Sequence, residues 1–401
     1  MNLRPVPCGE GRNTGTSNAL DHNACRKLFT SSGIVEAMSP LRLRQVDAAP
    51  GPALRMSDAV EPTTMPAGLL KARLPGGSAG AERGYGDLCP ALIAAAGQAP
   101  EHAGAMVAHL LILEQLRLYA SHRQRSRWFG EVERGRVLAG ALCGKGMASR
   151  LPCTRLIKDG YSWRLERAEF KVSCSLRSAV IATVALTEDE APALVLIPAS
   201  RDGVVNVDHG ESSTERPATI VIDNALVEDA EIVRLPADPT RRTPDGALSS
   251  LLQACVDTAR AQVLLGEAAA RKTAAAAAYA APHMAALGQL AIMVSCSRLL
   301  VNNAAERLDH AFAALQAGRP YEQALGEASV AAAEAGINAY QSWLLAASDV
   351  ADLVLHGGAD AASWPYRPAQ ALRSQESLLG KMRAIGNYYV NGQLPPADAK
   401  I

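Results

Sequence analysis

The stretch CTRLIKDGYSWRLERAEFKVSC, from Cys153 to Cys174, decides the fold that we expect for this chain. Apolar and polar residues nearly alternate along it, and the dipeptide Asp159-Gly160 interrupts the alternation. A period of two broken by an Asp-Gly turn is typical of two antiparallel strands joined by a tight hairpin. The stretch therefore predicts β-structure in the middle of the chain.

Further β-branched runs follow the hairpin, and clusters of Asp, Glu, Gly or Pro bound each of them. These runs are AVIATVAL (179–186), APALVLIPAS (191–200), GVVNVD (203–208) and PATIVIDNALV (217–227). About a hundred residues of short strands can close into a small barrel or sandwich. We therefore expect a central β-domain over residues 137–240.

Helical periodicity flanks this β-domain on both sides. Before it, we expect helices over residues 67–75, 86–98 and 101–135, with a break near Ser121 and an end at Gly135. After it, we expect long helices over residues 247–278, 283–316 and 321–355, and a last helical segment near the end of the chain. The sequence thus predicts an irregular extension (1–60), a helical N-terminal domain (61–136) and a C-terminal four-helix-type bundle (241–401).

Composition excludes several classes of function. The 401 residues include 40 basic and 40 acidic side chains, so the formal net charge is zero, and aromatic residues make up 4%. Nucleic-acid binders usually carry a basic face or a stacking platform, so we expect no nucleic-acid partner. The eight cysteines form no Cys-x-x-Cys pair, which indicates reduced thiols in a cytoplasmic protein and no metal site. No signal peptide is evident, and charges interrupt the apolar helices, so we expect no membrane span.

The order of helices, β-domain and helices resembles the acyl-CoA dehydrogenase fold, which makes the expected fold class α+β and multi-domain. Residues 106–142 resemble the helices of that fold running into its first strand, residues 158–174 its hairpin, and GESSTERPATIVIDNALV (210–227) a later strand. LHGGADAAS (355–363) followed by IGNYYVNGQLPP (385–396) is most similar to the flavin-dependent monooxygenase branch, the dibenzothiophene monooxygenase-like proteins.

This resemblance implies a reduced-flavin-dependent monooxygenase that acts on a small organic substrate, such as a secondary metabolite. Reduced FMN or FAD, supplied by a separate reductase, would react with oxygen to give a C4a-(hydro)peroxyflavin in a dry pocket. The resemblance also implies a homotetramer or homodimer. It leaves open whether the substrate is free or attached to a carrier protein.

The catalytic residues implied by the resemblance are His109, Ser173 and Glu376. His109 falls on a helix that faces the flavin, where an imidazole can bond a peroxide or move a proton. The alternative is a core-edge histidine bonded to a backbone carbonyl. Ser173 either borders the flavin ring or is an ordinary strand serine. Glu376 stands where an acid–base group is expected.

The cofactor contacts implied by the resemblance come from strand ends and from the C-terminal segment. They are Leu142, Cys143, Ser173, Arg216, Gly357, Gly358 and Arg373. Glycine permits close approach of the backbone to a ring or a phosphate, although a Gly pair after a helix can also be a simple C-cap. Arg216 could instead pair with a nearby carboxylate.

Several residues depart from the family pattern, and they fall at the expected site. The loop N-A-x-S-E appears here as GALCG (140–144), the hairpin Gly and Lys are replaced by Arg167 and Glu169, and Cys174 replaces a glycine. These losses keep a second hypothesis open, in which a divergent member works without flavin as a biosynthetic enzyme or a binding partner. An acyl-CoA or acyl-carrier-protein dehydrogenase with Glu376 as base is a further alternative.

Overall fold

The computed structural model describes eight segments of the chain, and all structural statements below concern them. They are residues 65–74, 84–140, 154–172, 179–207, 218–238, 242–274, 281–356 and 375–395. Contacts within the chain separate Met1–Arg55 from Met56–Ile401, and every described residue belongs to the second unit. The irregular extension expected over residues 1–60 lies outside the described residues.

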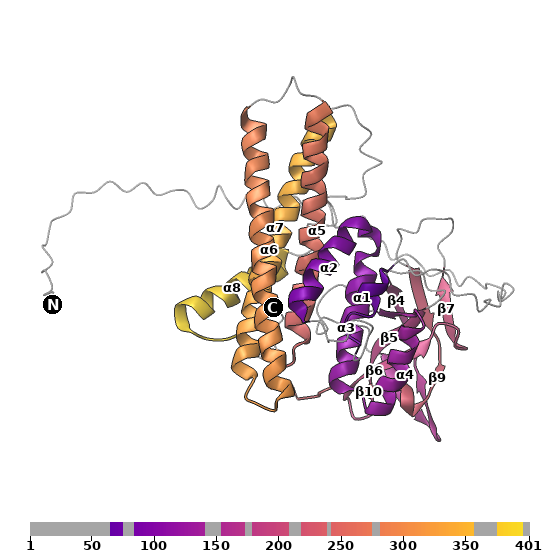
Figure 1. Ribbon diagram of the computed structural model, residues 1–401. Helices are drawn as coiled ribbons and strands as arrows, with labels where there is room; N and C mark the ends of the chain where they lie inside the picture. Colours follow the sequence, from indigo (N-terminus) through magenta and orange to yellow (C-terminus); the bar gives the residue numbers. More distant parts are fainter. Residues whose placement is uncertain are drawn as a thin grey trace, which may run out of the picture. The chain divides into compact units, whose positions relative to one another are not determined.

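Helices precede the sheet, as expected (Figure 1). They are α1 (Ala67–Leu70), α2 (Tyr85–Gln98), a 3-10 turn (Pro100–His102), α3 (Ala103–Tyr119) and α4 (His122–Glu133). The predicted break near Ser121 is confirmed, because Ser121 caps α4: its hydroxyl accepts from the Gln124 N–H, and the Gln124 side chain accepts from the Ser121 N–H. Gly135, at φ +91°, follows the end of α4 in the left-handed conformation of a helix terminus.

The strands form two sheets, and their bounds follow the β-branched runs of the sequence. They are β1 (Val137–Gly140), β2 (Thr154–Asp159), β3 (Ser162–Leu165), β4 (Ala168–Val172), β5 (Ala179–Leu186), β6 (Pro192–Pro198), β7 (Val204–Val207), β8 (Ala218–Ile222), β9 (Ala225–Val227) and β10 (Ile232–Arg234). The larger sheet has the order β10-β6-β5-β2-β3-β9 with β1 also paired to β5, and the smaller sheet has the order β4-β8-β7.

The predicted hairpin is confirmed. β2 and β3 pair antiparallel, with Asp159 opposite Ser162, and Gly160 between them has a φ of +60°. Glycine at the first central position of a two-residue turn accepts this conformation without steric cost.

Strands β5 and β6 are buried on both faces, which explains why their sequences are continuously apolar. Val180 and Ala182 on β5 join the core beneath the helices, whereas Ile181 and Ala185 join a second core together with Ile220 and Ile222 of β8. Because side chains alternate across a strand, one face of the larger sheet packs on helices and the other on the smaller sheet.

Long helices make up the C-terminal part of the chain: α5 (Asp245–Ala274), α6 (Ala281–Gln316), α7 (Glu322–His356) and α8 (Gln375–Asn391). Figure 1 shows α5, α6 and α7 side by side, and each of the three contacts the other two. Alanines line the buried side of α7, at Ala328, Ala331, Ala335 and Ala339. A single hydrophobic cluster includes residues of α2, α3, β5, β6, α5 and α7, so the helical segments and the larger sheet share one core.

Helix α6 is sparsely charged in its first half. Arg298 is the only charged residue between positions 285 and 305. Among the described residues, Ala285–Gln316 is the one helical segment long and apolar enough to cross a membrane, with a mean hydropathy of 1.4 in its best window. Only 22% of that window is buried within the chain, which leaves much of its surface uncovered.

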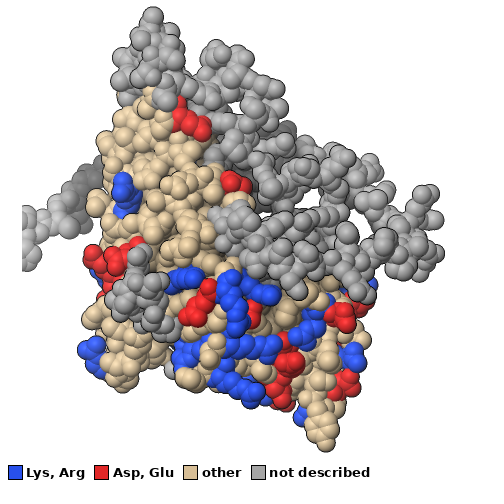
Figure 2. Space-filling model, turned by 45° about the vertical axis from the view of Figure 1, so that its right-hand side comes forward, with Lys and Arg blue, Asp and Glu red and all other residues tan. Residues whose placement is uncertain are grey.

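Charged residues are unevenly distributed over the face drawn in Figure 2. Basic and acidic side chains gather in the lower part of the view, where blue and red are interspersed, and the described surface above them carries few charges. Mixed signs at close range give no broad field of a single sign on this face.

Candidate functional site

His109 lies in the middle of α3 and is fully buried. The Leu138 N–H donates to Nδ1 at 3.1 Å, so the proton of the neutral ring is on Nε2, which donates to the carbonyl of Leu70 at 3.0 Å. Burial lowers the pKa of His109 to about 4, and the bond to Leu70 only partly opposes this shift. Both ring nitrogens are thus engaged with the backbone, which is the structural alternative named above; the expectation that this imidazole faces an open flavin slot is not met.

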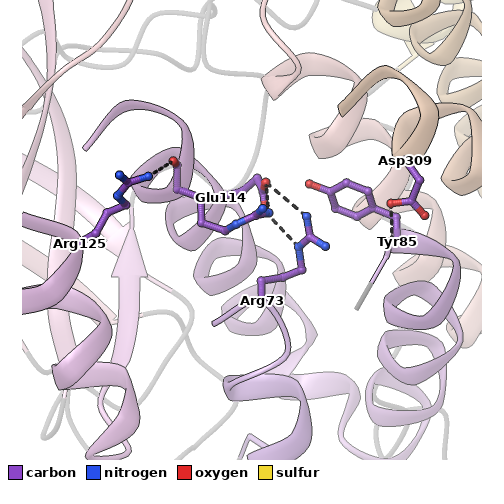
Figure 3. Close-up of polar contacts among 6 residues, drawn as sticks. Arg73, Tyr85, Glu114, Arg125 and Asp309 are labelled. Carbon is purple, nitrogen blue, oxygen red and sulfur yellow. Dashed lines mark hydrogen bonds and ion pairs between the residues drawn. The ribbon is translucent and has the colours of Figure 1, made fainter. Parts of the chain in front are cut away.

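A buried ionic network lies farther along α3 (Figure 3). Glu114 accepts from Arg73 Nε at 3.2 Å and from an Arg117 guanidinium N–H at 2.6 Å. The Arg73 guanidinium also lies 4.5 Å from the centre of the Tyr85 ring. Burial raises the pKa of Glu114, and Arg73 counters that shift. Burial, together with the nearby charges of Arg73 and Arg125, lowers the pKa of Arg117 to about 10.

The same region is tied to the bundle through Asp309 of α6. Its carboxylate oxygens accept from the N–H groups of Tyr85 at 2.8 Å and of Gly86 at 3.1 Å. These donors begin α2, and the first N–H groups of a helix have no partner within the helix. The Asp309 carboxylate therefore caps α2 from a distant part of the chain, and the Tyr85 ring packs on Phe312, with the ring centres 5.3 Å apart.

Sequence reasoning missed this network. A signal was present, because Glu114 interrupts the apolar run HLLILEQLRL (109–118), and a carboxylate within a fully buried helix needs a cation. The sequence did not show which cation pairs with Glu114, because Arg73 is 41 residues away along the chain.

Most of the expected flavin contacts lie just beyond the ends of described elements. Leu142 and Cys143 follow β1, Gly357 and Gly358 follow α7, and Arg373 precedes α8; these five lie outside the described residues.

Ser173 and Arg216 also lie outside the described residues. Their described neighbours Val172 and Ala218 are paired partners on β4 and β8. Glu376 lies in the first turn of α8, within the described backbone.

A cavity among the described residues lies in the C-terminal helical part of the chain. It has a volume of about 600 Å³ and lies between α6, α7 and α8, lined by residues that include Leu300, Glu334, Ile337, Asn338, Met382 and Tyr389. The Tyr389 hydroxyl donates to Glu334 at 2.8 Å. His109, the expected site residue whose side chain is described, is not among its lining residues. The described residues contain no group of His, Cys, Asp or Glu able to hold a metal ion.

A helical N-terminal segment, a two-sheet β-domain and a bundle of long helices with a shared core make up an acyl-CoA dehydrogenase-like fold, which two solved monooxygenases share. TdsC, a dibenzothiophene monooxygenase from Paenibacillus sp. A11-2 solved with FMN and indole, is similar over 83% of this chain and 90% of its own, with a TM-score of 0.65 and 17% identity.

Two further solved structures share this fold. The methanesulfinate monooxygenase MsuC from Pseudomonas fluorescens matches with a TM-score of 0.65 at 18% identity, over 83% of this chain and 90% of its own. XiaF from Streptomyces sp., solved with FADH2 and glycerol, matches with a TM-score of 0.56 at 14% identity, over 82% and 87%. No protein-family model matches the sequence, and no curated protein does. At sequence identities of 14% to 18%, these similarities show that this chain has the same fold as the three proteins.

Proposed function

We propose that this protein is a reduced-flavin-dependent monooxygenase acting on a small organic substrate of secondary metabolism. The observation that carries the proposal is the fold, which this chain shares over about four fifths of its length with TdsC and MsuC, both monooxygenases by name. TdsC was solved with FMN and XiaF with FADH2, so FMN or FAD is the cofactor that we propose.

The residues that we propose to hold the flavin are those at the element ends: Leu142 and Cys143 through backbone amides, Gly357 and Gly358 through close backbone approach, and Ser173, Arg216 and Arg373 through their side chains. Glu376 is the proposed acid–base group. Flavin, when bound in reduced form, would supply the activation of oxygen. His109 has no free nitrogen in this structure, so we assign it no chemical step.

Two observations favour a second function. The histidine that the resemblance places at the flavin is sealed between two backbone groups, and the loop over residues 140–144 lacks the family's polar side chains. Both features fit a divergent protein that keeps the fold without flavin chemistry, as a biosynthetic enzyme or a binding partner.

The partners that we propose are a flavin reductase, a second copy of this chain, and a substrate that is free or held on a carrier protein. The cytoplasmic location that we propose fits the free state of the described cysteines Cys89, Cys255 and Cys296. The largely uncovered apolar surface of α6 supports association of copies.

A flavin titration distinguishes the two functions. The purified protein is mixed anaerobically with reduced FMN or FAD, and binding is followed by absorbance and fluorescence. We expect a dissociation constant on the order of micromolar for one reduced flavin, weakened several-fold in Arg373→Ala but not in Arg383→Ala, a substitution of an exposed arginine on α8. Absence of binding by either flavin, oxidised or reduced, would exclude the monooxygenase and leave the flavin-free function.

A further inference from the structure

The cavity of about 600 Å³ between α6, α7 and α8 is a groove with one side of α7 as its base. Glu334, Ile337, Asn338 and Gln341 form this base, and they are spaced by three and four residues along the helix. Such spacing places side chains on one face of a helix. Small-molecule sites usually have volumes of about 300–1,000 Å³, so the groove has the size of a ligand site.

Apolar side chains form the walls of the groove, and they are Leu300 of α6 and Met382 and Ile385 of α8. Gly386 of α8 also lines it, and an added Cβ there would meet no atom within 4 Å, so this part of α8 leaves the space unfilled. Met382 and Tyr389 are 38% and 70% exposed, which opens the groove to solvent along α8. A ligand can therefore enter without displacing a helix.

One end of the groove carries a negative charge. Glu334 is the only acidic residue among those that line it, and none of the lining residues is Lys or Arg. The Tyr389 hydroxyl donates to Glu334 Oε1 at 2.8 Å, whereas Oε2 has no hydrogen-bond partner among the described residues. Arg307, whose charge also acts on Tyr389, pairs with Glu327 at 3.5 Å. One oxygen of the Glu334 carboxylate is thus available to a cation.

The Tyr389 ring lies next to this carboxylate because its hydroxyl is bonded there. The bond and the charge of Glu334 raise the pKa of Tyr389. A carboxylate together with an aromatic ring suits an organic ammonium group, which gains charge-assisted hydrogen bonds from the first and a cation–π contact from the second. An anionic ligand would be repelled at the same position.

The other end of the groove is polar and uncharged. Gln341 lies seven residues beyond Glu334, about 10 Å along α7 at 1.5 Å per residue, and its side chain has no hydrogen bond to a described residue. Asn338, between them, accepts through Oδ1 from the buried Ser297 hydroxyl at 2.7 Å, which fixes its amide at the base of the groove. Ile337 and the apolar walls separate the charged end from the amide of Gln341.

We propose that this groove binds a small organic ammonium compound whose charged group pairs with Glu334. Its apolar body lies against Ile337 and the side chains of α8, and a hydroxyl or carbonyl group at its far end bonds Gln341. An arylalkylamine with a hydroxyl on its ring has this arrangement of groups. The inference goes beyond the proposed monooxygenase, and it does not depend on flavin.

Isothermal titration calorimetry of the full chain, without flavin and near neutral pH, tests the proposal with tyramine as the probe. We expect one site with a dissociation constant on the order of 0.1 mM. Binding should be at least about tenfold weaker for 3-(4-hydroxyphenyl)propionate, which has a carboxylate in place of the ammonium group, and several-fold weaker for phenethylamine, which lacks the hydroxyl. Absence of saturable tyramine binding, or equal affinity for tyramine and the propionate, overturns the proposal.

Two pairs of variants locate the site. Glu334→Gln removes the charge and should weaken tyramine binding by at least about tenfold, whereas Glu322→Gln, at an exposed position of α7 outside the groove, should not change it. Gly386→Leu fills the groove and should have a similar effect, whereas Gly380→Leu, at an equally open position of α8 that does not line the groove, should keep the natural affinity. Leucine favours helix more than glycine, so both leucine variants should fold.

Light scattering on the same proteins distinguishes a ligand from a second copy of the chain. Loss of tyramine binding in Gly386→Leu with no change of mass supports the ligand site. A lower mass of Gly386→Leu than of the natural protein shows that another copy covers the groove, and this overturns the proposal. Natural tyramine affinity in both Glu334→Gln and Gly386→Leu means that the probe binds elsewhere, and it overturns the proposal as well.

Discussion

His109 connects three parts of the chain through one ring. The Leu70 carbonyl belongs to the last residue of α1, the Leu138 N–H belongs to β1, and the imidazole of α3 joins them. Each of these backbone groups would otherwise be buried without this partner, at a cost of about 1–3 kcal/mol each. A neutral histidine suits this position because it offers one donor and one acceptor at the same time.

The buried imidazole makes stability depend on pH. Its pKa is about 4 in the folded protein and near 6.5 when unfolded, so the unfolded state binds more protons between these values. The free energy of unfolding should therefore fall as pH drops from about 6.5 to about 4, by about 3 kcal/mol in total from this residue. His109→Gln, which keeps a donor and an acceptor, should lack this part of the pH dependence.

Urea unfolding of both proteins at several pH values between 4.5 and 7.5 measures the difference. The comparison removes the opposite contribution of Glu114, Asp245 and Asp257, whose pKa values are raised by burial in both proteins. His310→Gln, at an exposed position on α6, should keep the natural slope. Parallel pH curves for His109→Gln and the natural protein would contradict the prediction.

At the scale of elements, the position of Gly203 before β7 needs glycine. Its φ is +86°, and an added Cβ would lie 2.6 Å from the carbonyl oxygen of Asp223. The Asp223 N–H also donates to the Gly203 carbonyl at 2.7 Å, so this close approach joins the start of β7 to the end of β8. Neither atom can move away without breaking the pairing of the smaller sheet.

Gly203→Ala should therefore destabilise the fold by about 1–3 kcal/mol, the usual cost of strained backbone. Gly266 provides the matched control, because it lies on the exposed side of α5 with no atom within 4 Å of an added Cβ. Gly266→Ala should raise stability by up to about 1 kcal/mol, since alanine favours helix. Thermal and urea unfolding measure the stability of both variants. If both substitutions change the free energy of unfolding in the same direction, the contact of an added Cβ with Asp223 causes no strain.

At the scale of the whole described molecule, Asp309 joins the bundle to the N-terminal helices. Its carboxylate holds the first N–H groups of α2, and the backbone at Gly84 approaches so closely that an added Cβ would be 2.7 Å from Asp309 Oδ2. Together with the shared hydrophobic cluster, this contact couples segments that are more than 200 residues apart.

Asp309→Ala should lower the free energy of unfolding by about 1–2 kcal/mol, the typical effect of losing a helix cap and its charge. Because the helical segments share one core, we expect a single transition at a lower temperature. Calorimetry checks this, with His310→Ala at the neighbouring exposed position as control. Two separated transitions in Asp309→Ala would instead show that the cap holds otherwise independent domains together.

Local pattern alone determined the order of elements, the Asp159-Gly160 hairpin and the helix break at Ser121, because each depends on residues within a few positions of one another. Tertiary structure alone decided the role of His109, the partner of Glu114 and the cap on α2, since their partners are 29 to 224 residues away. Periodicity shows which face of a helix is buried, but only the packing of the folded chain shows which groups contact that face. His109, which the sequence analysis placed at a flavin, therefore bonds two backbone groups instead, the Leu70 carbonyl and the Leu138 N–H.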